Sequence, residues 1–172
     1  MAAGNTYVAL ASTTLTTTTA SVTFSSISSA YTDLVIVVTG QGVYTSTDFL
    51  DVGMQYNGDT GSNYSTTRIR GYASEVNGAR NSSETSIRAA FIHGLVTASA
   101  VHSSMSINIF NYSNTTTYKT MVSRSGYPTA VSANIGLWNS TSAITSVLLK
   151  NNDSASGFHT GTTFQLFGIA AA

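Results

Sequence analysis

The chain has 172 residues, of which only 8% are charged, and its formal net charge is zero. This length is typical of one domain, so we expect residues 1–172 to form a single domain. Zero net charge provides no long-range attraction to nucleic acid or to an anionic membrane, and the absence of cysteine excludes disulfides and thiolate metal sites.

Hydroxyl side chains take the place of charged ones: the chain contains 26 serines and 27 threonines. Lys, Glu and Arg are good helix formers, whereas Thr is β-branched and suits a pleated sheet. The composition therefore favours strands over helices. A neutral, hydroxylated surface also suits packing beside copies of the chain or beside a partner protein.

The expected strands alternate apolar and polar residues or form short apolar runs. Ala20–Phe24 and Ser104–Ile109 alternate, while Leu34–Val38 is a continuous apolar run that suits a central strand covered on both faces. In chain order the candidates are Tyr7–Leu15, Ala20–Phe24, Leu34–Val38, Leu50–Tyr56, Arg68–Ala73, Ile87–His93, Ser104–Ile109, Tyr118–Ser123, Asn134–Trp138, Ile144–Lys150 and Thr162–Ile169.

Turn signals separate these segments, at Gly40–Gly42, Asn57–Asp59, Asn77–Gly78, Ser125–Pro128 and Asn151–Asp153. No stretch of a dozen residues has a helical period. Many short strands with regularly spaced turns predict an all-β fold, namely an antiparallel β-sandwich that is jelly-roll-like, with about 8–10 strands and little helix.

Residues that carry chemistry are few. There is no Gly-x-Ser-x-Gly motif, and Asp48 and Asp51 would point to opposite faces of an extended strand. His93, His102 and His159 lie far apart in the sequence, so a three-histidine metal site would have to assemble in space. We therefore expect no enzyme, no cofactor and no metal.

Two further segments allow a binding interpretation beside a structural one. Asn57–Asn63 is superficially similar to a calcium loop but lacks its carboxylate density, so we interpret it as a turn whose Asx side chains bond within it. Trp138 and the nine tyrosines could line a sugar-binding groove, but a core anchor is the favoured interpretation of Trp138.

The charged residues are unevenly distributed, because four of the five arginines fall in one stretch. Arg68 and Arg70, two apart on a strand, would share a face. Arginine forms forked bonds to carboxylates and is enriched at interfaces. The residues predicted to contact a partner are therefore Arg68, Arg70, Arg80 and Arg88, with a solvated polar segment as the alternative.

Several stretches resemble virion structural proteins of tailed bacteriophages. They are Ala20–Ile27 with Tyr31–Val35, Gln55–Ser65, Gly136–Ser146 and Gly161–Ile169. Members of this family end similarly, with a "W…AIT-S-I-x-L" pattern followed by "G-S-T-F-x-L-Y-G-I". The resemblance covers most of the chain, but it is a pattern of hydroxylated strands and turns rather than a catalytic signature.

The resemblance implies a location on the virion, after synthesis in the host bacterial cytoplasm. Because strands begin soon after Met1, we expect the module alone, without a fibre shaft, as in a decoration (cement) protein. Such a protein binds the outside of the head, contacts the major capsid protein and forms a homo-oligomer, a dimer or a trimer. The alternative is a receptor-binding module of a head fibre or tail fibre that recognises host glycans. Neither nucleic acid nor membrane is an expected partner.

Overall fold

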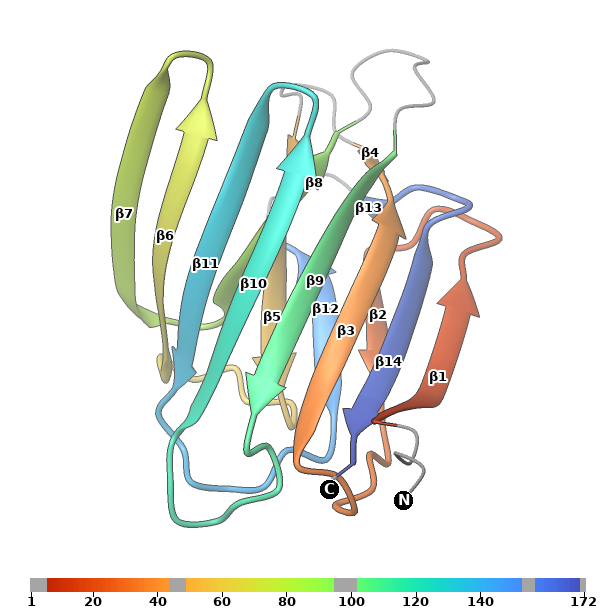
Figure 1. Cartoon of the computed structure of the whole chain (residues 1–172), viewed down its shortest axis with the longest axis vertical. Coiled ribbons are helices and arrows are strands. Elements are labelled where there is room, and N and C mark those ends of the chain that lie inside the picture. The colour runs from red at the N-terminus through yellow and green to blue at the C-terminus, as the bar shows by residue number, and fades with distance from the viewer. Residues whose placement is uncertain (1–5, 44–48, 95–101, 153–156, 171–172) are drawn as a thin grey trace.

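β-branched and hydroxylated segments form strands throughout the part of the chain that the computed structural model describes, residues 6–43, 49–94, 102–152 and 157–170 (Figure 1). These residues contain no helix. The strands are β1 Tyr7–Thr14, β2 Ser21–Phe24, β3 Asp33–Gly40, β4 Gly42–Val43, β5 Phe49–Tyr56, β6 Tyr64–Tyr72, β7 Glu75–Glu84, β8 Ile87–His93, β9 Ser103–Phe110, β10 Lys119–Tyr127, β11 Ala130–Trp138, β12 Val147–Asn151, β13 Gly157–Phe158 and β14 Thr163–Ile169.

The strands form two main sheets that pack against each other. The large sheet has eight strands in the order β1-β14-β3-β9-β10-β11-β6-β7, and the small sheet has four in the order β2-β12-β5-β8. Strands β13 and β4 form a separate two-stranded pair, and all of these pairings are antiparallel. The predicted all-β antiparallel sandwich is thus confirmed. The jelly-roll arrangement is not confirmed, because the sheets are unequal and β9, β10 and β11 form a simple meander.

Hydrophobic alternation located most strands within a few residues of their bounds. Leu34–Val38 lies within β3, between β14 and β9, and all of its side chains are buried except that of Val37, which is half-buried. The strand β7 was not predicted, and the expected turn at Asn77–Gly78 lies inside it. The turn signal at Ser125–Pro128 is displaced as well, since β10 runs on to Tyr127 and only Pro128 and Thr129 separate it from β11.

The main core fills the space between the sheets. Ile36, Ile107 and Met121 of the large sheet are fully buried, as are Met54 and Leu149 of the small sheet. Burying each such side chain stabilises the fold by about 1.5–3 kcal/mol relative to leaving it in water. A second, smaller cluster contains Phe91, Tyr127 and Ala130, with the half-buried Phe49 against it.

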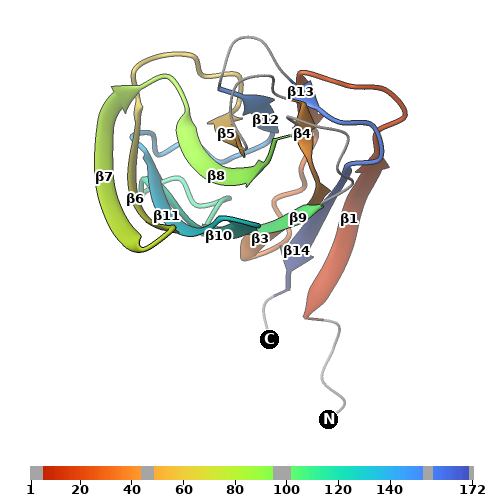
Figure 2. The same cartoon turned by 90° about the horizontal axis from the view of Figure 1, so that it is seen from above.

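The large sheet curls around one edge of the small sheet. Seen from above, β11, β6 and β7 bend towards β8, which lies inside the curl (Figure 2). Strand β8 contacts β10, β11 and β6 in addition to its partner β5. It also carries a bulge, because Val52 pairs with Ala90 and Gly53 pairs with Arg88. This arrangement places side chains of β8 against the inward face of β6.

Candidate interaction surfaces

Three of the four arginines predicted to contact a partner lie together. Arg68 and Arg70 of β6 and Arg88 of β8 line a cavity of about 260 Å³. Its other lining residues are Phe49, Asp51 and Phe91. We call this the arginine cavity. Arg80 does not belong to it.

Strand parity explains this grouping. Arg68 pairs with the buried Asn134 and Arg70 with the buried Ser132, so both arginines face inwards. Their spacing had predicted a shared face but not which one. Arg80 instead pairs with Thr67 and is exposed. Thr67 directly precedes Arg68 in β6, so its side chain points to the opposite face of the sheet.

Hydrogen bonds from neighbouring strands hold Arg88 beside β6. The backbone N–H of Arg88 donates to Oγ1 of Thr66 at 3.0 Å, and its carbonyl accepts from Nδ2 of Asn134 at 2.9 Å. Its guanidinium Nη1 donates to Oδ2 of Asp51 in an ion pair, in which the Asp51 side chain is 4% exposed and that of Arg88 is 31% exposed. This is an ion pair between β8 and the neighbouring strand β5.

Arg68 and Arg70 are held by aromatic rings rather than by anions. The guanidinium of Arg68 lies 5.1 Å from the centre of the Phe91 ring, and that of Arg70 lies 5.3–5.6 Å from the rings of Phe49, Tyr72 and Phe91. Within the described residues, neither guanidinium donates a hydrogen bond or forms an ion pair. Their N–H donors therefore have no acceptor among the described residues.

The arginine cavity has an excess of positive charge, because Asp51 neutralises only one of three guanidinium groups. Burial lowers the pKa of Arg68; the charge of Asp51 opposes this effect, and the charges of Arg70 and Arg88 add to it. An arginine still keeps its charge at neutral pH, so proton transfer is not available to it. Binding an anion is what this arrangement can do chemically.

In a second polar cluster, around Trp138, the indole N–H and the Tyr64 hydroxyl bond to groups of the protein, whereas the buried Tyr56 hydroxyl has no hydrogen-bond partner in the described residues. Nε1 of Trp138 donates to Oδ2 of Asp59 at 2.6 Å, and this bond is the main cause of a lowered pKa for Asp59. Asp59 also accepts bonds from the backbone of Gly61 and the side chain of Asn63 within the same loop, as the Asx-turn interpretation predicted. Trp138 is 3% exposed and packs on Tyr64, which confirms it as a core anchor.

The remaining sequence candidates do not form a site in the described residues. No group of three or more histidine, aspartate or glutamate side chains there is placed to hold a metal ion, and His93, His102 and His159 belong to different segments. Asp48 lies outside the described residues. No helix in the described part of the chain has the length and hydropathy to cross a membrane.

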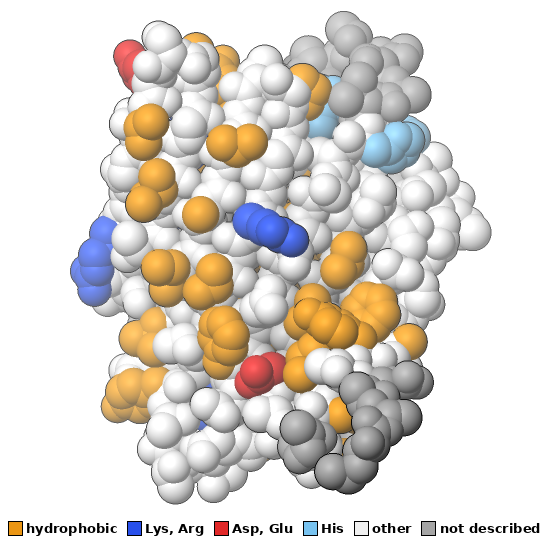
Figure 3. Space-filling view, viewed as in Figure 1, with side chains coloured by type: hydrophobic (Ala, Val, Ile, Leu, Met, Phe, Trp, Pro, Cys, Tyr) orange, Lys and Arg blue, Asp and Glu red, His pale blue; other side chains and the backbone are white. Residues whose placement is uncertain are grey.

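The outward side of the large sheet, which we call the outer face, was not predicted as a surface of interest. One row of residues in register crosses all eight strands of this face: Ala9, Phe167, Val35, Asn108, Val122, Ile135, Thr67 and Arg80. Figure 3 shows hydrophobic side chains spread over this face among polar ones, with few charges. The exposed large apolar side chains on this face are Tyr7, Ile69, Val76, Phe110, Val122, Val131 and Ile135.

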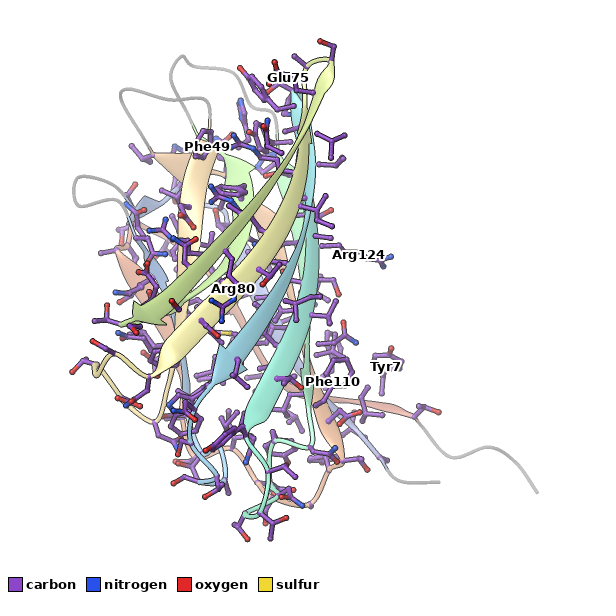
Figure 4. All side chains as sticks on the ribbon, turned by 90° about the vertical axis from the view of Figure 1, so that its left-hand side faces the viewer. Tyr7, Phe49, Glu75, Arg80, Phe110 and Arg124 are labelled. Atoms are coloured by element: carbon purple, nitrogen blue, oxygen red, sulfur yellow. The ribbon has the colours of Figure 1, made fainter. Side chains whose placement is uncertain are left out.

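The outer face is hollowed beside its centre. A groove of about 680 Å³ lies between Tyr7 and Arg124, with Val35, Val37 and Ser106 among its lining residues. Figure 4 shows Tyr7 and Arg124 pointing away from the sandwich, on the side of the large sheet opposite Phe49. The sequence does contain a sign of this face. Strands such as β10 have apolar residues on both sides, for example Met121, which faces the core, and Val122, which is exposed.

Comparisons with models of known protein families and with curated proteins give no match. The resemblance to tailed-phage virion proteins therefore stays a prediction from the sequence.

Proposed function

We propose that this chain is a non-enzymatic decoration protein that binds the outside of an assembled tailed-phage head and stabilises contacts between major capsid subunits. The observation that carries the proposal is the outer face, a broad sheet surface on which exposed apolar and hydroxyl side chains greatly outnumber charges. The resemblance of Gly136–Ser146 and Gly161–Ile169 to phage virion proteins supports the same function.

The outer face is large enough for a specific protein contact. Eight strands about 4.8 Å apart, each with about seven residues at about 3.3 Å, cover about 800–900 Å². A standard protein interface buries about 800 Å² on each partner. Exposed apolar side chains such as Ile135, 56% exposed, and Val131, 67% exposed, would gain free energy from being covered.

The occupant that we assign to the outer face is the protein surface of the capsid shell. A ligand that binds only the assembled shell stabilises it by mass action. A symmetric dimer or trimer of the chain would add avidity, since several copies would engage neighbouring capsid subunits together. Such an oligomer is part of the proposal.

Binding of the purified chain to heads that lack it tests the proposal. We expect co-sedimentation with these heads and an increase in their resistance to heat. Ile135→Lys should weaken this binding by at least tenfold, because it would bury an unpaired charge in the contact. It should barely change the stability of the free chain, since the side chain is largely exposed.

Thr23→Lys is the matched control, because Thr23 is an exposed strand residue of the small sheet, away from the outer face. It should leave head binding unchanged. The proposal is wrong if the wild-type chain does not co-sediment with heads and leaves their heat resistance unaltered. Saturable binding to host glycans without head binding would instead favour a receptor-binding fibre module.

A further inference from the structure

The arginine cavity contains more positive charge than the described residues neutralise. Arg88 is paired with Asp51, whereas Arg68 and Arg70 form no ion pair within the described residues. In addition, Nε of Arg88 is buried and has no hydrogen-bond partner there. Buried donors of this kind are usually satisfied, so the cavity is suited to an acceptor from outside the described residues.

We propose that the arginine cavity is a binding site for one carboxylate group. A guanidinium presents a planar fork of N–H donors that matches the two oxygens of a carboxylate, and such charge-assisted pairs are about twice as strong as neutral hydrogen bonds. Arg68 and Arg70 come from alternate positions of one strand and therefore offer two forks side by side. The site does not depend on the proposed function.

Aromatic packing prepares the site for its ligand. The rings of Phe49 and Phe91 lie against the guanidinium groups of Arg70 and Arg68, which restricts their movement without using their N–H donors. A pre-organised donor loses less entropy when the ligand binds. The edge-to-face contact between Phe49 and Phe91, with centroids 5.1 Å apart, fixes the rings in turn.

The size and lining of the cavity favour a small carboxylate over a sugar ring. About 260 Å³ is below the range of about 300–1,000 Å³ that is typical of pockets for larger ligands. The guanidinium groups already lie over faces of Phe49 and Phe91, so those faces are not open for stacking on a sugar. The end of an acidic side chain or a free small carboxylate fits this description better.

Titration of the ¹⁵N-labelled chain with sodium acetate tests the site, with the arginine Nε–H signals as the readout. Sodium chloride at the same ionic strength serves as the reference. We expect saturable shifts of the Arg68 and Arg70 signals with a dissociation constant of about 1–10 mM, because a four-atom ligand has a low ceiling on its affinity. Arg70→Gln and, separately, Arg68→Gln should each weaken binding by about tenfold.

Arg80→Gln is the matched control, since Arg80 lies in the neighbouring strand but faces the other side of the sheet. It should titrate like the wild type. Shifts that stay linear in acetate and are equal at Arg80 would show general ion screening and overturn the site.

Two other probes identify the chemical class of the ligand. Inorganic phosphate that saturates the signals where acetate does not would overturn the carboxylate assignment in favour of a tetrahedral oxyanion. Glucuronate that binds more than tenfold more tightly than acetate would contradict the argument against a sugar ring. Equal affinities for acetate and glucuronate are the expected result, because the site contacts only the carboxylate.

Discussion

Strand β6 passes through two polar clusters that use their groups differently. At its start, Tyr64 packs on Trp138, and the indole N–H and the Tyr64 hydroxyl both bond to groups of the protein. Towards its end, Arg68 and Arg70 contact aromatic rings but no anion of the described chain. The first cluster resembles a stabilising network, and the second resembles a binding site for an anion.

The two clusters differ in whether the hydrogen bonds of their polar groups contribute to folding or to ligand binding. Satisfied donors and acceptors contribute to folding, whereas donors that remain unmet contribute only when a ligand arrives. Substitutions at the two ends of β6 should therefore differ in kind. Those around Trp138 should lower stability, and those in the arginine cavity should mainly change anion binding.

Trp138→Ala should produce the largest effect. It removes a large buried ring that contacts Tyr56 and Tyr64, with centroids 5.5 and 6.3 Å away, and leaves Asp59 without its indole donor. We expect a loss of about 3–5 kcal/mol in the free energy of unfolding. Urea unfolding followed by circular dichroism measures it.

Trp138→Phe is the intermediate control, because it keeps a ring but lacks the N–H donor to Asp59. Its cost should lie clearly below that of the alanine variant. If both variants unfold like the wild type, the Trp138 cluster is not the stabilising half of the comparison.

The two clusters also differ in how far the sequence could predict them. The sequence predicted Trp138 as a core anchor from its size and apolar neighbours, and this outcome is correct. The hydrophobic pattern did not identify the buried face of β11, because Ile135 has the opposite parity to Trp138 and is 56% exposed. Arg68 and Arg70 share a face by strand periodicity alone. The arrival of Arg88 could not be predicted, because it depends on the bulge in β8 and on the curl of the large sheet.

Register explains the remaining differences. Arg80 belongs to β7, whose exposed residues show no apolar alternation, so the sequence gives no sign of the strand or of its pairing with β6. Without that pairing the direction of Arg80 is undetermined. The outer face was missed for a related reason: Val131 and Ile135 become neighbours of Gly71 and Thr67 only through the register of β11 with β6.

Tyr64→Phe should have a moderate effect that depends on pH. At neutral pH it should cost about 1–2 kcal/mol, because the Tyr56 backbone N–H, 3.1 Å from the Tyr64 hydroxyl, loses its acceptor. Burial is the main cause that raises the pKa of Tyr64 to about 12, from an ordinary value of 10.0. A raised pKa contributes stability that is complete below pH 10 and is lost as the pH rises from 10 to 12.

Urea unfolding at several pH values checks this prediction. The wild type should lose stability between pH 10 and 12, and Tyr64→Phe should lose less over the same interval. Some loss should persist in the variant, since burial also raises the pKa of Tyr56 well above its ordinary value. Tyr118→Phe is the control, because Tyr118 is 55% exposed. This variant should have the same pH profile of stability as the wild type. An identical pH profile for the wild type and Tyr64→Phe would contradict the assignment.

Arg70→Gln should have the smallest effect on stability, within about 0.5 kcal/mol of the wild type. The loss of stacking on Phe49 and Phe91 destabilises the fold. The removal of a positive charge near Arg68 and Arg88 relieves repulsion and offsets part of that loss. Asp51→Asn is the informative contrast. It leaves Arg88 without its carboxylate and should cost about 1–3 kcal/mol.

Urea unfolding in low salt, with and without acetate, separates these two roles. Acetate should stabilise the wild type and Asp51→Asn more than it stabilises Arg70→Gln, because the folded Arg70→Gln chain binds acetate about tenfold more weakly. A loss above about 2 kcal/mol for Arg70→Gln would mean that its stacking is as structural as that of Trp138. Both ends of β6 would then be stabilising networks, and the positive charge of Arg68 and Arg70 would serve folding rather than ligand binding.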